Sequence, residues 1–167
     1  MKRKTLRAML MAAIPGLIAA LPVPAWSDAR DDFARPRGGD QIEGVWDVTV
    51  TARDCATGAA LGVFNAQAMF HRGGTLTDMS AAPPTSRGIG VGVWRRDGPG
   101  PTYTAMFRFN RFNPDGTLAL SRVVTRKLTL SFDANMETSV NTSEDRDPSG
   151  TVVATGCTTD VGTRLFF

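Results

Sequence analysis

The sequence predicts an all-β fold, an eight-stranded antiparallel meander closed as an up-and-down barrel. Runs of alternating or β-branched residues fill the chain from Gly44 onward, and turn signals such as "NPDG" and "DPSG" separate them at regular intervals. No run has a convincing apolar period of 3.6, which argues against helices. Turns this short join antiparallel neighbours, because a parallel connection needs a dozen or more residues.

Two segments precede the predicted barrel. Residues 1–27 have a basic start, an apolar middle, and small residues at Ala25 and Ser27, which is the order of a secretory signal peptide. A membrane anchor is the alternative, but the apolar run is short and ends in two prolines. Residues 28–41 are charged and contain proline and glycine, so they predict a flexible segment. The barrel domain is expected over residues 42–167.

Cleavage of the signal peptide changes the charge of the chain. Four of the 19 Lys and Arg residues lie in residues 1–27 and none of the 16 Asp and Glu residues do, so the cleaved chain has a net charge of about −1. This balance does not favour nucleic acid or an anionic membrane as a partner. About 140 residues remain, which suits one domain with a sizeable core. We predict a secreted or periplasmic protein with no membrane anchor after cleavage.

The predicted strands are bounded by Gly, Pro, Asn and Asp in the intervening turns. In chain order they span residues 44–53, 61–71, 74–80, 90–96, 102–112, 117–132, 136–145 and 150–164. The longest irregular piece, residues 80–92, contains two prolines and three glycines. It is either a loop that caps one end of the fold or a plain crossover.

The two cysteines, Cys55 and Cys157, are expected to form one disulfide in an exported protein, with two free buried thiols as the alternative. Cys55 follows the first strand and Cys157 lies in the last, so a bond between them makes these strands neighbours, as in a closed barrel. An immunoglobulin-like sandwich is the main alternative fold, but its disulfide usually links two interior strands.

The disulfide also suggests a register for the first and last strands. If Cys55 and Cys157 are direct partners in one antiparallel ladder, Trp46 lies opposite Phe166 and one diagonal step from Arg164. All three then share a face, and Arg164 is expected to stack on the indole ring at the floor of the barrel.

Two short motifs resemble the lipocalin and wider calycin pattern. They are "GVWDV" at the start of the first strand and "TDVGTR" at the end of the last. In that family, the tryptophan of a Gly-x-Trp motif packs against an arginine of the final strand at the closed end of the barrel. The resemblance implies this structural role for Gly44, Trp46 and Arg164. The family's middle motif, its N-terminal 3₁₀ turn and its helix after the last strand are not recognisable in this sequence.

Side-chain alternation predicts which residues face the interior. With Trp46 inward, Val48 and Val50 follow it, and Phe64 and Phe70 add bulk. An eight-stranded barrel is at the size where side chains fill the interior or leave room for one small ligand. Interior aromatic residues are therefore either ordinary core or ligand contacts. The candidate ligand-binding residues are Trp94, Tyr103, Phe107, Phe109, Arg122 and Arg126.

Arg122 and Arg126 depart from the apolar pattern of their strand, because they share parity with its leucines. Burying either charge without a partner would cost several kcal/mol. Either a bulge between Ser121 and Arg126 turns both outward or both lie at the rim, or they line a wet cavity where they meet a carboxylate or other anion. The cavity reading would suggest an amphiphilic acidic ligand.

The sequence contains few signals for catalysis. His71 is the only histidine and lies at a turn, and neither a metal-ligand cluster nor a nucleophile motif accompanies it. The acidic stretch "EDRDPSG" from Glu144 is read as a charged turn, because calcium-loop spacing is not met. We predict no catalytic residue, no metal and no cofactor.

These observations predict a lipocalin-like barrel that binds a small hydrophobic or amphiphilic molecule in its interior. One alternative is a small barrel isomerase or cyclase resembling allene oxide cyclase barrels, which would place a polar group with a shifted pKa in the cavity. Another is a structural or protein-interaction module with a filled core. The sequence predicts no oligomeric state.

Overall fold

The computed structural model describes residues 40–166, so the predicted signal peptide and residues 28–39 lie outside the described residues. The strands are β1 (Gly44–Arg53), β2 (Ala60–His71), β3 (Thr75–Ser80), β4 (Gly90–Arg96), β5 (Thr102–Phe112), β6 (Leu118–Leu130), β7 (Met136–Arg146) and β8 (Val152–Arg164). Their bounds differ from the predicted ones by at most two residues. Within residues 40–166, no helix is long and apolar enough to cross a membrane.

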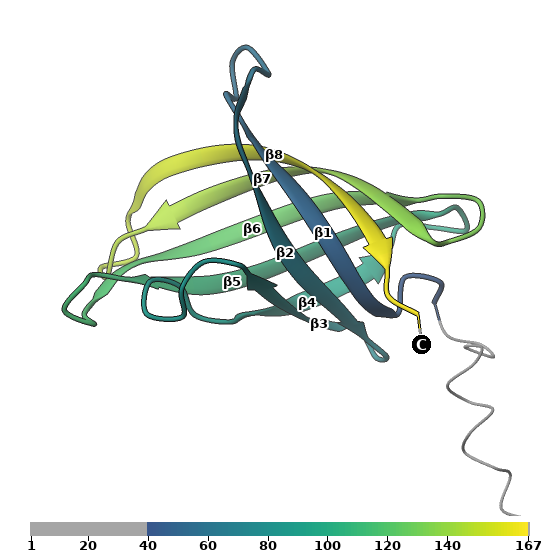
Figure 1. Ribbon diagram of the computed structural model, residues 1–167, viewed down its shortest axis with the longest axis horizontal. Coiled ribbons are helices and arrows are strands. Elements are labelled where there is room, and N and C mark those ends of the chain that lie inside the picture. Colours follow the sequence, from purple (N-terminus) through teal and green to yellow (C-terminus); the bar gives the residue numbers. More distant parts are fainter. Residues whose placement is uncertain (1–39, 167) are drawn as a thin grey trace, which may run out of the picture.

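The strands form one closed barrel. Each strand pairs antiparallel with the next, and β1 also pairs with β8, which confirms the predicted topology (Figure 1). Two of the tight turns place glycine at positive φ, Gly116 at 82° and Gly150 at 91°, a backbone conformation that other residues rarely adopt. In Figure 1 the hairpin between β1 and β2 projects beyond the rest of the sheet at the top of the view.

The disulfide between Cys55 and Cys157 is present, but the predicted register of β1 and β8 is wrong by two residues. Trp46 pairs with Arg164, not Phe166, and Cys157 pairs with Arg53. Cys55 lies in the turn after β1 has ended, and its Cα is 5.3 Å from that of Cys157. The bond therefore joins a turn to a strand, and it does not report a direct cross-strand pair.

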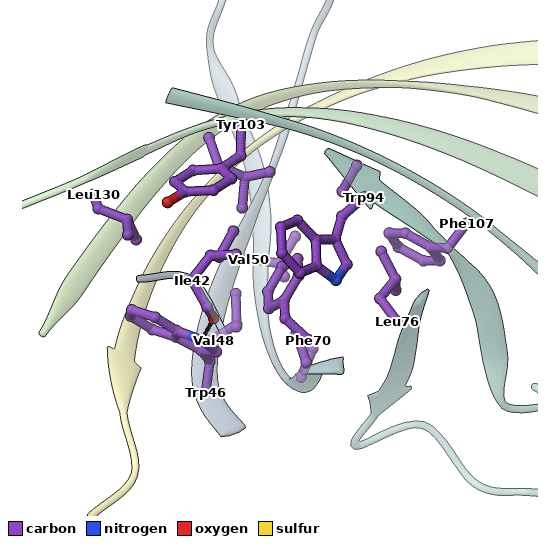
Figure 2. Close-up of a cluster of buried hydrophobic side chains, with 14 of the residues drawn as sticks. Ile42, Trp46, Val48, Val50, Phe70, Leu76, Trp94, Tyr103, Phe107 and Leu130 are labelled. Atoms are coloured by element: carbon purple, nitrogen blue, oxygen red, sulfur yellow. Dashed lines mark hydrogen bonds between the residues drawn. The ribbon is translucent and has the colours of Figure 1, made fainter. Parts of the chain in front are cut away.

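The closed end of the barrel is built around Trp46 and Arg164. The guanidinium carbon of Arg164 is 4.3 Å from the centre of the indole ring. The indole Nε1 donates to the carbonyl oxygen of Ile42 at 2.9 Å, and Figure 2 shows the Ile42 side chain beside the ring. Ile42 and Trp46 have no exposed surface. A turn closed by the amide of Glu43 on the carbonyl of Asp40 thus seals this end.

Above this floor lies a packed aromatic core. The ring of Trp94 meets Phe70 and Tyr103 edge-on, with centroids 6.3 and 6.0 Å apart (Figure 2). Leu128 and Leu130 of β6 are buried against this group. The half of the barrel next to Trp46 is therefore filled by side chains. Any interior space must lie in the other half.

Candidate ligand-binding cavity

A cavity of about 440 Å³ occupies the half of the barrel opposite Trp46. The inward positions of β1 and β5 form its apolar wall: Val48, Val50, Phe107 and Phe109. Phe107 and Phe109 lie stacked, with centroids 6.2 Å apart and an interplanar angle of 24°. The period-two alternation that buries Trp46 and Tyr103 in the core continues along the same strands into the cavity. This explains why four apolar residues of its wall could be predicted.

The segment between β3 and β4 forms part of the cavity wall. Ala81, Ala82, Ser86 and Arg87 line the cavity, so this segment covers the gap beyond the ends of the two short strands. The amide of Phe112 donates to the carbonyl of Ser86 at 3.1 Å, and the amide of Gly88 to that of Asn110 at 2.9 Å. These bonds attach the segment to the far end of β5. Residues 81–89 thus connect β3 to β4 and contribute to the cavity wall.

Arg87 attaches the same segment to the interior. Its guanidinium pairs with the carboxylate of Asp78 on β3, and both side chains are nearly buried. The guanidinium carbon also lies 3.8 Å from the centre of the Phe109 ring. Burial raises the pKa of Asp78, and the attraction of Arg87 offsets only part of this shift. A carboxylate with a raised pKa therefore lies in the cavity wall.

Arg122 and Arg126 both face the interior. The β5–β6 ladder runs without interruption from the Thr102–Thr129 pair to the Arg111–Leu120 pair, so the alternative of a bulge between Ser121 and Arg126 is wrong. The bulge was one of the alternatives because buried charges need partners. The structure supplies such a partner for Arg122, whose Nε and Nη2 reach the two carboxylate oxygens of Asp145 at 2.5 and 2.6 Å.

Arg126 lies at the inner end of the cavity within a buried polar network. Its Nη2 donates to Glu137 at 2.7 Å and to Ser139 at 3.3 Å, and it lies 3.1 Å from the carboxylate of Asp160. The side chains of Arg126, Glu137 and Asp160 are each at most 5% exposed. Burial raises the pKa of Glu137, although Arg126 counteracts the shift. One guanidinium thus faces two carboxylates at the boundary between core and cavity.

Asn141 completes the polar side of the cavity. It is the direct partner of Arg126 in the β6–β7 ladder, and its Nδ2 donates to the Thr158 hydroxyl at 2.8 Å. Among residues 40–166, neither Asn141 Oδ1 nor Arg126 Nε has a hydrogen-bond partner, although both atoms are buried. Buried polar atoms without a hydrogen-bond partner are rare in folded proteins, because they lose their hydrogen bonds to water and gain none in return.

The structure separates the six candidate ligand-binding residues into two groups. Phe107, Phe109, Arg122 and Arg126 line the cavity, whereas Trp94 and Tyr103 belong to the packed core beneath it. His71 is exposed and shares a hydrogen bond with Thr77 at 3.0 Å. Among the described residues, no group of three or more His, Cys, Asp and Glu side chains is placed to hold a metal ion.

Sequence reasoning missed the carboxylates and the amide of the cavity region. Asp78, Glu137, Asn141 and Asp160 occupy inward positions of their strands, and Asp145, assigned to a charged turn, pairs with Arg122. A signal was available, because these residues share the inward parity of the buried residues on the same strands.

No protein-family model matches the chain, and neither a curated protein nor a solved structure matches it significantly.

Proposed function

We propose that this protein binds one small apolar or amphiphilic molecule inside its barrel, as a lipocalin-like carrier does. The observation that carries the proposal is the cavity of about 440 Å³, with an apolar wall on β1 and β5 and polar groups on β6 and β7. Ligand sites in proteins have this character: mostly apolar surface with a few polar groups that fix orientation. A filled-core interaction module is disfavoured, because that reading expects no such space.

The proposed location is the periplasm or the extracellular space. The predicted signal peptide supports it, and so does the disulfide between Cys55 and Cys157, since such bonds persist in oxidising compartments. In these compartments a barrel with an interior site would shield an apolar molecule from water. Transfer of apolar surface into the cavity is the proposed source of affinity.

The test is native mass spectrometry of protein purified gently from its exported fraction. We expect a reproducible extra mass, which is lost after unfolding and refolding. Val124→Trp fills the cavity, because Val124 lines it and packs on the core. Val123→Trp is the matched control, since its side chain points to the opposite face of β6. Loss of the extra mass in Val124→Trp alone supports the proposal, whereas a bare mass in every sample, with no uptake from a mixed lipid pool, contradicts it.

A barrel isomerase or cyclase is the second candidate function. The observation that favours it is Asp78, a cavity-lining carboxyl whose pKa is raised by burial. Proton transfer to and from Asp78 would leave the product with the mass of the substrate.

Asp78→Asn separates the enzyme from the carrier. The molecule recovered from the native protein is incubated with wild-type and variant protein, and species of equal mass are separated by chromatography. A new isomer formed by the wild type but not by a variant that still binds the molecule supports the enzyme. An unchanged molecule in both samples supports the carrier.

A further inference from the structure

We propose that the ligand carries an uncharged polar group that both donates and accepts a hydrogen bond, such as a hydroxyl, and that Arg126 and Asn141 bind it. This inference rests on the proposed binding function and narrows its ligand class. A carboxylate is disfavoured at this position, which reverses the acidic ligand suggested by the two arginines of β6.

The first observation is a donor and an acceptor on paired residues. Arg126 and Asn141 face each other across the β6–β7 ladder, both line the cavity, and each is 3% exposed. The hydrogen bonds of Arg126 leave from Nη2, and its Nε has no partner among residues 40–166. The same holds for Asn141 Oδ1. A hydroxyl that reaches both atoms would accept a hydrogen bond from Arg126 Nε and donate one to Asn141 Oδ1.

The orientation of the Asn141 amide is determined by its neighbours. The Thr158 hydroxyl lies 3.4 Å from Asp160 Oδ1, and a carboxylate oxygen can only accept from it. Thr158 therefore accepts from Asn141, which assigns Nδ2 to that contact and leaves Oδ1 as the free atom. An acceptor at this position disfavours a carboxylate oxygen, which has no proton to donate.

The second observation is the charge balance around the cavity. Arg87 pairs with Asp78, Arg122 pairs with Asp145, and Arg126 faces both Glu137 and Asp160. Each of these three guanidinium groups thus has a carboxylate partner, and Arg126 has two. A ligand carboxylate placed here would give up its hydration without gaining an unpaired cation. Arg111 also lines the cavity, but its side chain is exposed, where water and salt weaken its attraction.

The ladder also indicates how the ligand lies. Along β6, Val124 and then Arg122 follow Arg126 toward the open end of the cavity. Val124 pairs with Phe107 of β5, and Arg122 pairs with Phe109. The Arg126–Asn141 pair is therefore at the inner end and the apolar wall lies between it and the mouth. The polar group enters first, and the apolar part of the ligand fills the space against the phenylalanines.

The experiment measures displacement of the fluorescent apolar probe N-phenyl-1-naphthylamine by three compounds of equal chain length. They are 1-octanol, octanoate at a pH where it is ionised, and 1-chlorooctane, which has no proton to donate. We expect 1-octanol to displace the probe at a concentration about tenfold lower than either of the others. Asn141→Leu should reduce this preference about tenfold, and Thr138→Leu, on the outward face of β7, should leave it unchanged.

The outcomes distinguish this inference from the function on which it rests. Binding of the probe with octanoate equal to or better than 1-octanol overturns the uncharged group and leaves the carrier function standing. Equal displacement by 1-octanol and 1-chlorooctane overturns it as well, because a water molecule then satisfies the two atoms. Failure of the probe and of all three compounds to bind overturns both proposals.

Discussion

Trp46 and Arg164 lie directly opposite each other in the β1–β8 ladder, with the guanidinium stacked on the indole ring. The same guanidinium donates to the carbonyl oxygens of Gln41, Glu43 and Ala134, the last at 3.0 Å through Nε. One side chain therefore joins the N-terminal turn, the β6–β7 turn and the floor of the barrel.

Replacement of Arg164 should destabilise the closed end. Arg164→Ala removes three charge-assisted hydrogen bonds and the stacking contact, and we expect the free energy of unfolding to fall by about 2–4 kcal/mol. The free energy of unfolding of Arg164→Lys should lie between those of Arg164→Ala and the wild type. An ammonium group keeps the charge but lacks the planar set of donors of a guanidinium. Urea unfolding measures both. Arg95→Ala, at a side chain that is 78% exposed, is the control and should change stability by less than about 0.5 kcal/mol. Equal losses in the alanine variants would contradict the assigned role.

The disulfide should contribute strongly to stability, because its cysteines are 102 residues apart in the sequence. Constraint of so long a loop in the unfolded chain predicts a loss of about 4–5 kcal/mol when the bond is removed. Urea unfolding of the Cys55→Ser/Cys157→Ser double variant measures this loss, and wild-type protein treated with a reductant should match it. A double variant as stable as the oxidised protein would refute the expectation.

Replacement of Arg126 should destabilise the protein, because the carboxylates around it lose their counter-charge. Arg126→Met leaves Glu137 and Asp160 buried without their counter-charge, and we expect a loss of about 3–5 kcal/mol in the free energy of unfolding. The triple variant Arg126→Met/Glu137→Gln/Asp160→Asn removes every charge of the network and should recover part of this loss. If the triple variant is no more stable than the single one at neutral pH, repulsion and desolvation of the carboxylates are not the cause.

Glu137 should make stability depend on pH. Burial raises its pKa in the folded protein, so the folded state binds the proton more tightly than the unfolded state does. Its contribution to stability is therefore fully present below the ordinary glutamate pKa, and it is lost as pH rises from there through the raised value. Denaturation curves from about pH 4 to about pH 8 should show Glu137→Gln gaining stability relative to wild type as pH increases. Parallel curves for the two proteins would contradict the shift.

Much of the candidate site could be predicted from the sequence, namely its apolar wall and the two arginines of β6. Val48, Val50, Phe107 and Phe109 were placed on the inner face because alternation along a strand is local information. Asp78, Asn141 and Asp160 were not assigned to the cavity, since a polar residue at an inward position has meaning only when its partner is known. Arg126 illustrates this, because its partners lie on β7 and β8 and its inward position depends on them.

The sequence by itself determined the number, order and bounds of the strands and the bond between Cys55 and Cys157. Turn residues and side-chain alternation act over a few neighbours, so they can be read along the chain. Only the tertiary structure decided that Trp46 pairs with Arg164, because Cys55 lies in a turn and the disulfide tolerates an offset of two residues. It also decided the cavity, whose existence depends on how side chains from separate strands share the interior of one closed sheet.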